Sequence, residues 1–165
     1  IFAGMLLHGS LAAYLKALNE GVSGATGVVI QFPFYAGIMG MMASSGMSAD
    51  FVRYFSEIAT AATMPFLTFI SAGLLNILVP SGGGQWAIQG PIAVEAARAL
   101  DANLGWTIVA FAWGDAWTNL IQPFWALPAL AIAGLRAKDI MGFCALALFT
   151  TGAVIGAIFL IAGAM

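Results

Sequence analysis

The sequence predicts an all-α integral membrane protein, because the chain is very apolar and its few charges are widely spaced. Of its 165 residues, 62% are hydrophobic and only 7% are charged, and the formal net charge is −2. Soluble domains carry about 25% charged residues, so the composition excludes an ordinary soluble fold. The long charge-free stretches match the roughly 20 apolar residues that a helix needs to cross about 30 Å of hydrocarbon. We therefore expect a single membrane domain over residues 1–165.

The charge-free stretches define the expected membrane spans. The chain starts at Ile1, inside an apolar run, so we expect residues 1–15 to end a truncated span in a fragment that lacks its N-terminal part. A polar connection with glycines is expected at residues 16–26. Residues 45–57 hold three charges among aromatic residues and suit a short segment at the membrane interface. The remaining ordinary spans are expected at residues 27–44, 58–79 and 140–163.

The segment 80–100 is expected to be a re-entrant or broken segment and not to continue as one helix. Pro80 is followed by Ser81 and three consecutive glycines, and Pro91 comes soon after. In a helix each glycine costs about 1 kcal/mol relative to alanine, and each proline about 3 kcal/mol. We expect a helix to resume only after Pro91, since proline suits a first helical turn. Backbone freed from helical hydrogen bonds at membrane depth must be buried in protein or line a watery cavity, so this break should face an interior site.

The same break has the composition of an anion-binding turn. Glycines let a ligand approach the main chain, and the N–H groups at the start of a helix attract negative charge. Apolar runs that are interrupted in this way mark binding sites in transporters. The alternative is a glycine-rich exposed loop between two ordinary helices. On the first interpretation, the residues that bind a substrate carboxylate are Ser81, Gly82, Gly83, Gly84 and Gln85.

A second interrupted stretch, residues 105–134, is longer than one span requires and is expected to form a discontinuous helix. It carries Asp115, and an ionisable residue inside a span is a candidate functional residue by default. Together with Thr118 and Asn119 it offers oxygen ligands that suit a hard cation such as Na+, and the carboxylate could instead carry a proton. The alternative role for Asp115 is to cap a half-helix after Gly114, and the two roles are compatible.

Several other functional classes are excluded by composition. A single cysteine cannot form an internal disulfide, and one histidine with one cysteine cannot supply the usual ligands of a zinc site. Five scattered basic residues do not form the basic patch that a nucleic acid would need. The three glycines are not a phosphate loop, because no lysine follows them. We therefore expect no cofactor, apart from a coupling Na+ or H+.

Three stretches of the chain resemble a known family. They are QFPFYAGIMGMM, NILVPSGGGQWAIQGPIAVEAARAL and AWGDAWTNLIQPFWALPALAIAGLRAKDIMG. They are similar to the bacterial short-chain fatty acid transporter family, of the acetoacetate/butyrate permease type, within a larger ion-transporter superfamily. The resemblance implies the C-terminal part of an inverted-repeat secondary transporter, in which residues 81–85 and 114–123 are the two breaks. It also implies that the remainder of the same polypeptide supplies the other repeat.

The resemblance implies transport of acids such as acetoacetate or butyrate across the bacterial inner membrane, coupled to a cation or proton. Such a substrate is one carboxylate on a small apolar tail, and the lack of arginine inside a clear span argues against di- and tricarboxylates. The expected partners are this monocarboxylate, membrane lipid, the rest of the polypeptide and, as an open question, a second copy in a homo-oligomer. The alternatives are a transporter of the same fold for another small organic anion, a passive channel and an integral-membrane enzyme.

Overall fold

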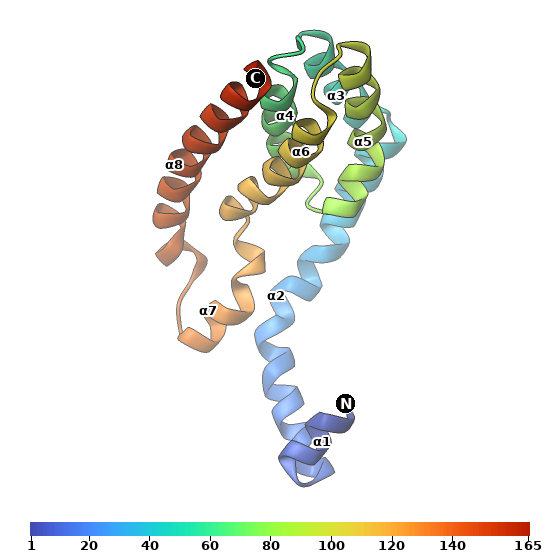
Figure 1. Cartoon of the computed structure of the whole chain (residues 1–165). Helices are drawn as coiled ribbons and strands as arrows, with labels where there is room; N and C mark the ends of the chain where they lie inside the picture. Colours follow the sequence, from blue (N-terminus) through green and yellow to red (C-terminus); the bar gives the residue numbers. More distant parts are fainter.

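The computed structural model is all-helical, as the sequence predicts, and it describes residues 1–23, 26, 29–123 and 125–165. No strand occurs in these residues. Helices α3 to α6 and α8 form a bundle, and α2 extends from this bundle toward the N-terminus (Figure 1). The helices are α1 (Phe2–His8), α2 (Leu11–Ser44), α3 (Met47–Glu57), α4 (Met64–Leu78), α5 (Gly82–Ala99), α6 (Leu104–Thr118), α7 (Leu127–Ala133) and α8 (Ala137–Ala164), with 3-10 turns η1 (Asn119–Ile121) and η2 (Pro123–Trp125).

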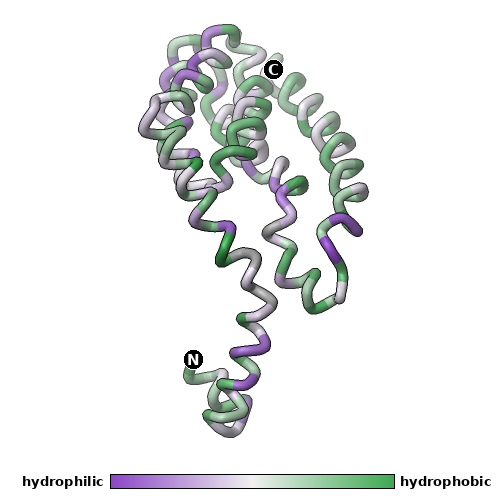
Figure 2. The backbone as a smooth tube through the Cα atoms, turned by 180° about the vertical axis from the view of Figure 1, so that it is seen from behind, coloured by the Kyte–Doolittle hydropathy of each residue, from purple (hydrophilic) through white to green (hydrophobic). Residues whose placement is uncertain are grey.

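The N-terminal part is a helical arm that lies far from the C-terminus (Figure 2). The turn between α1 and α2 forms where Gly9 takes a positive φ of 69°, and α2 begins where Ser10 Oγ accepts a hydrogen bond from the N–H of Ala13 (3.2 Å). The polar connection expected at 16–26 is wrong, because residues 16–23 lie inside α2. Once a helix has started, each further residue gains a hydrogen bond, so isolated polar residues and glycines do not stop it.

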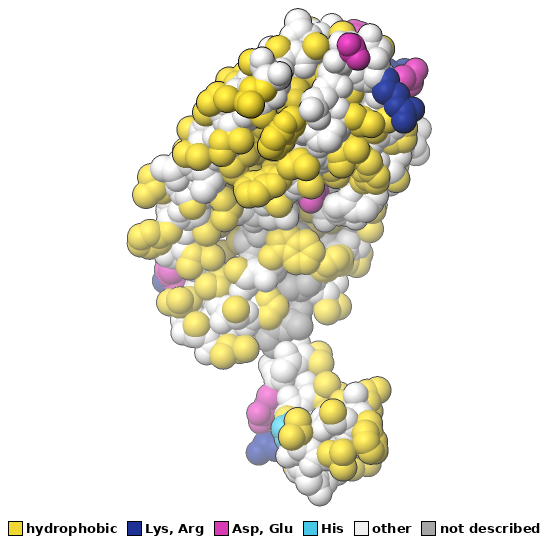
Figure 3. All heavy atoms as spheres, in the orientation of Figure 1, with side chains coloured by type: hydrophobic (Ala, Val, Ile, Leu, Met, Phe, Trp, Pro, Cys, Tyr) yellow, Lys and Arg dark blue, Asp and Glu magenta, His cyan; other side chains and the backbone are white. Residues whose placement is uncertain are grey.

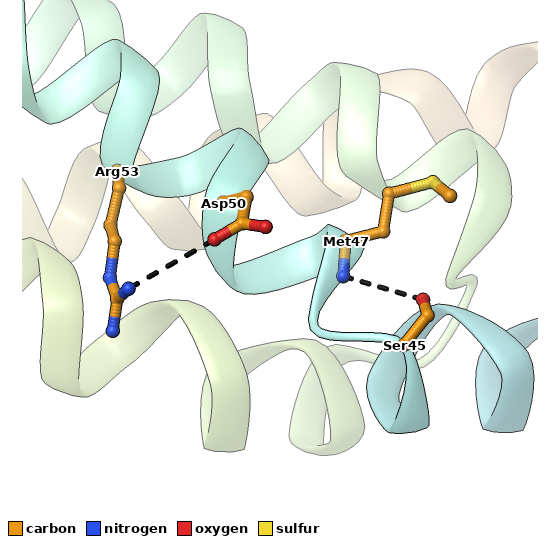
Figure 4. A network of polar contacts seen from close by, with 4 residues as sticks. All are labelled: Ser45, Met47, Asp50 and Arg53. Atoms are coloured by element: carbon orange, nitrogen blue, oxygen red, sulfur yellow. Dashed lines mark hydrogen bonds and ion pairs between the residues drawn. The ribbon is translucent and has the colours of Figure 1, made fainter.

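The turn from α2 into α3 is fixed by short-range polar contacts (Figure 4). The N–H of Met47 donates to Ser45 Oγ (3.4 Å), and Gly46 has a φ of 77°. The ion pair between Arg53 and Asp50 is long, at 3.9 Å, and both side chains are exposed. Exposed pairs of this kind contribute at most about 1 kcal/mol, so the turn itself sets the direction of α3.

The bundle is built around the crossing of α4 and α6. A Cβ on Gly114 of α6 would overlap the carbonyl oxygen of Phe69 and lie 2.8 Å from the Cβ of Ala72, both on α4. Only a residue without a side chain permits this close approach. Phe69 and Ala110 are fully buried at the crossing. The two helices are therefore locked to each other at one register.

Helix α8 packs on this crossing through Trp117 of α6. The indole Nε1 donates to the carbonyl oxygen of Leu148 (2.8 Å), and the ring lies 4.8 Å from that of Phe69. A Cβ on Gly152 would overlap the same indole, so this glycine makes room for Trp117. In the described part of the chain, α8 is the one helix that is long and apolar enough to cross a membrane, with a mean hydropathy of 2.3. The segments Val29–Ser44 and Met64–Leu78 are shorter apolar helices.

Much of the outer surface is apolar. Figure 3 shows hydrophobic side chains over most of one face, with charged side chains mainly near the upper end and on the arm. Large apolar side chains on α6 and α8 are strongly exposed, among them Trp113 (53%), Phe143 (77%) and Phe149 (73%). A soluble protein rarely leaves so much apolar area in water, whereas a surface of this kind suits contact with lipid. The fold therefore agrees with a membrane protein.

The break expected over 80–100 is much shorter than the sequence suggests. Helix α4 ends at Leu78 and α5 begins at Gly82, so the three glycines form the first turn of a helix and Pro91 lies within it. The first N–H groups of a helix have no partner inside it, and here Ser81 Oγ accepts a hydrogen bond from the N–H of Gly84 (3.3 Å). The expectation that a helix resumes only after Pro91 is wrong, because the cap and the packing against α4 offset the weak helix propensity.

Replacing Gly114 by alanine tests the α4–α6 crossing. The new methyl group would collide with the main chain of α4, and overpacking of this kind costs about 1–3 kcal/mol. We expect a lower midpoint of thermal unfolding in detergent. The matched control is Gly142→Ala on α8, where a Cβ would meet nothing within 4 Å, so that its midpoint should be unchanged or raised. Equal midpoints for the two variants would contradict the close crossing.

Candidate functional site

The two interrupted segments meet at one place inside the bundle. Helices α4 and α6 have 15 residues each, which at about 1.5 Å per residue gives about 22 Å. Neither can cross about 30 Å of hydrocarbon alone. The end of α4 lies against the end of α6, so main-chain groups that have lost helical partners gather there. Such groups must find other partners when they are buried.

Asn76 near the end of α4 joins these two helix ends. Its side chain is only 1% exposed. Its Nδ2 donates to the carbonyl oxygen of Asp115 (2.7 Å), to Thr118 Oγ1 (3.0 Å) and to Asn119 Oδ1 (2.8 Å). Sequence reasoning missed this residue. The available signal was an asparagine in an otherwise apolar run, four positions before Pro80, where an amide needs buried partners.

Two further side chains complete this contact between the ends of α4 and α6, which we call the junction. The hydroxyl of Thr118 donates to the carbonyl oxygen of Gly73 (2.8 Å), and Gln122 Nε2 donates to the carbonyl oxygen of Asn76 (2.8 Å). Thr118 is 3% exposed and Gln122 is 6% exposed. Each bond supplies a donor to a main-chain carbonyl on α4. The junction is therefore a buried hydrogen-bond network and not a loose loop.

A cavity of about 370 Å³ opens beside this junction. One end is polar and comes from the α4–α5 turn and the end of α6. Its lining residues are Asn76, Pro80, Ser81, Gly82, Asp115 and Asn119. The rest of the lining is mostly apolar and comes from α2 and η2. Its lining residues are Phe32, Tyr35, Ala36, Met39 and Trp125.

The carboxylate of Asp115 lies against the start of α5. A Cβ placed on Gly82 would be 3.2 Å from Asp115 Oδ2, so the absence of a side chain at Gly82 leaves the space that the carboxylate borders. The N–H groups in the first turn of α5 give this position a partial positive potential. The alternative that Asp115 caps a half-helix after Gly114 is wrong, because both residues lie inside α6, whose N-cap is Asn103.

The structure brings together four of the residues singled out from the sequence. Ser81 and Gly82 line the cavity with Asp115 and Asn119. The remaining four of them lie outside this lining. They are Gly83, Gly84, Gln85 and Thr118.

Of these four residues, Gln85 and Thr118 have side chains, and both side chains are hydrogen-bonded to other groups of the protein. Gln85 is fully buried, and its Nε2 donates to the carbonyl oxygen of Ala72 (2.8 Å) and to Gln89 Oε1 (3.0 Å). Thr118 is part of the junction described above. Both side chains hold α4 to a neighbouring helix.

The chemistry of the cavity is that of oxygen and amide groups. In the described residues, no three His, Cys, Asp or Glu side chains come together to hold a metal ion. An ion in this cavity would therefore have to use the Asp115 carboxylate with neutral oxygens. A small ligand would meet one acidic group, the cap of α5 and an apolar wall, in which the rings of Phe32 and Trp125 pack edge to face at 6.1 Å.

A family described as short chain fatty acid transporter matches residues 1–162. The chain belongs to this family. It is 49% identical over 154 residues to an Escherichia coli K12 protein named as a proposed short-chain fatty acid transporter, and 48% identical over 154 residues to a Haemophilus influenzae protein of the same name. Each match covers 93% of this chain but only 35% and 34% of the relatives, so the chain spans about a third of their length. No solved structure matches it.

Membership in the short chain fatty acid transporter family places the chain with membrane transporters and not with enzymes. The resemblance found in the sequence is confirmed over nearly the whole chain.

Replacing Thr118 by valine tests the junction. The change keeps the shape of the side chain but removes a buried hydroxyl that donates to the carbonyl oxygen of Gly73 and accepts from Asn76 Nδ2, which should cost about 1–3 kcal/mol of stability. We expect a lower unfolding midpoint. In the matched control, Thr150→Val, the hydroxyl bonds only to its own helix at an exposed position, so stability should change by less than about 0.5 kcal/mol. If both variants unfold alike, the junction is not what holds the two helix ends together.

Proposed function

We propose that this chain is part of a secondary active transporter that carries short-chain fatty acids, such as acetoacetate or butyrate, across the bacterial inner membrane in symport with a cation or proton. One observation carries the proposal: a single cavity combines the start of α5, the carboxylate of Asp115 and an apolar wall. A small monocarboxylate has the complementary parts, one charged head and one short apolar tail. A cavity of about 370 Å³ also lies near the lower end of ligand pockets, about 300–1,000 Å³.

The head of the substrate is proposed to bind at Ser81 and Gly82. There the first N–H groups of α5 favour an anion, and the missing side chain of Gly82 lets the ligand come close to the main chain. The tail then extends toward the aromatic wall on α2 and η2. Ser81, Gly82, Gly83, Gly84 and Gln85 were all candidates for this role, and the cavity favours the first two.

Coupling to a cation follows from the position of Asp115. Its carboxylate borders the place proposed for the substrate carboxylate. Two negative charges about 4 Å apart repel by about 4 kcal/mol at an effective dielectric constant of about 20. A proton or a cation on Asp115 would remove most of this repulsion. The anion would then bind well only when the second species is present, which is the requirement for symport.

The rest of the transport cycle is proposed to depend on further polypeptide. Because the relatives are about three times as long as this chain, we propose that the remaining polypeptide supplies the other repeat and closes the cavity on its open side. Alternating access would move one bundle against the other around this site. The bond network at Asn76 would move as one piece.

Transport by the complete polypeptide in proteoliposomes tests the proposal. Labelled butyrate and acetoacetate are offered with a Na+ gradient, a proton gradient or neither, and we expect accumulation above equilibrium with one gradient. Asp115→Asn should abolish accumulation, because the charge that needs neutralising is lost. Asp50→Asn, an exposed acid of the α3 surface, is the control and should transport normally. Equal, non-accumulating flux under all three conditions would point to a passive channel and contradict the proposal.

The position of the substrate head is tested by comparing two neighbouring glycines. A valine at Gly82 would fill the space between α5 and Asp115, whereas a side chain at Gly83 would meet nothing within 4 Å. We expect Gly82→Val to raise the half-saturating butyrate concentration by about tenfold or more, and Gly83→Val to have a much smaller effect. A tenfold change corresponds to about 1.4 kcal/mol of binding. The opposite ranking would move the binding position one residue further into the helix.

A further inference from the structure

Buried oxygen atoms without a hydrogen-bond donor are concentrated at the junction. In the described residues, five buried side-chain polar atoms have no partner: Ser48 Oγ, Asn76 Oδ1, Gln85 Oε1, Asp115 Oδ1 and Gln122 Oε1. Three of them belong to residues that are bonded to each other. Gln122 donates to the main chain of Asn76, and Asn76 donates to the main chain of Asp115. Native proteins leave few such atoms without a hydrogen-bond partner. A local excess of acceptors therefore indicates a place where a cation or a hydrogen-bond donor binds.

The orientation of the Asn76 amide is determined by its surroundings. Its Nδ2 lies 2.7–3.0 Å from three oxygen atoms of the α6 end. Turning the amide over would place Oδ1 against the carbonyl oxygen of Asp115 and Asn119 Oδ1, and oxygen atoms that cannot donate repel one another at that distance. Oδ1 is therefore left without a donor in a side chain that is 99% buried and lines the cavity.

One proton cannot satisfy this set of acceptors. A protonated Asp115 would offer one O–H group, which serves a single further acceptor. A metal cation instead accepts several oxygen ligands at once, and neutral amide oxygens with a carboxylate are ligands that hard cations prefer. Among the described residues that line the cavity, one side chain is acidic and none is basic. A single negative charge balances a monovalent ion and leaves a divalent ion undercompensated.

We propose that the cavity binds a sodium ion through Asn76 Oδ1 and the carboxylate of Asp115, with Asn76 as a ligand that holds the ion at the junction of α4 and α6. This inference rests on the proposed function for its purpose, since the ion neutralises Asp115 before the substrate carboxylate arrives. It adds the identity of the coupling ion and a residue that sequence reasoning did not include. The amide of Asn76 thereby has two roles: its nitrogen holds the helix ends together, and its oxygen faces the ion.

The test is the unfolding midpoint of the purified complete polypeptide in detergent, measured in NaCl, KCl and choline chloride at equal ionic strength and without substrate. An ion that binds only the folded state raises the midpoint, because it stabilises that state by RT ln(1 + L/Kd), where L is the free ion concentration. We expect NaCl to raise the midpoint above that in KCl and choline chloride. Asp115→Asn and Asn76→Ser should each weaken the apparent affinity for Na+ by about tenfold or more, since even outer-shell changes weaken metal sites by about 10–100-fold.

The control is Gln89→Met, which removes a buried amide that lies outside the cavity and bonds to Ser71 Oγ (3.0 Å). This variant should be less stable but keep the full sodium effect. If Asn76→Ser fails to fold, Asp115→Asn carries the test, because it replaces one carboxylate oxygen by an NH₂ group of similar size at a partly buried position. Equal midpoints in the three salts, or an unchanged sodium effect in Asp115→Asn, would overturn the inference.

The two proposals fail in distinguishable ways. If the polypeptide accumulates butyrate on a proton gradient and shows no sodium effect, the sodium site is wrong and transport stands. If sodium stabilises the protein through Asp115 but no short-chain acid is transported, the ion site stands and the substrate is wrong.

Discussion

The need to satisfy main-chain groups at membrane depth shapes this structure more than any other constraint. Helices α4 and α6 stop before they could cross a bilayer, and Asn76 and Thr118 near their ends are buried. Carbonyl groups near these helix ends receive donors from the side chains of Asn76, Thr118 and Gln122. Because each of these bonds links two segments, the same contacts that satisfy the main chain also place the end of α6 against the α4–α5 turn. The cavity exists where these segments meet.

Close helix packing makes this arrangement rigid. Gly114 allows α6 to touch the main chain of α4, and Trp117 fills the space between α6 and α8. The amide ladder from Gln85 through Gln89 to Ser71 holds α5 to α4 in the same way. Helices α4, α5 and α6 therefore present the polar end of the cavity as one unit. The apolar end is on different elements, α2 and η2.

The sequence predicts the helical class, the family and the two places where helices are interrupted. Asp115 and the α5 start could be found because a carboxylate or a run of glycines is rare inside apolar sequence. The extent of helix α5 could not, since the cap by Ser81 and the packing of α4 outweigh the low helix propensity of three glycines. Gln85 lies away from the cavity because of the direction in which its side chain leaves α5. That direction depends on where the helix begins, which the sequence around Pro80 does not reveal. Asn76 escaped notice because one asparagine in an apolar run is uninformative until its three partners are known.

The division of the cavity between two sets of helices has an evolutionary consequence. The polar part of the cavity depends on a dense network in which Asn76 and Thr118 each have several partners, so a substitution there disturbs many contacts at once. The wall on α2 consists of side chains such as Ala36 and Met39 that make no hydrogen bond to that network. Substitutions on α2 can therefore remodel the apolar part of the cavity while leaving the hydrogen-bond network intact. A lineage of such proteins could diversify in the ligands it accepts by changing one helix.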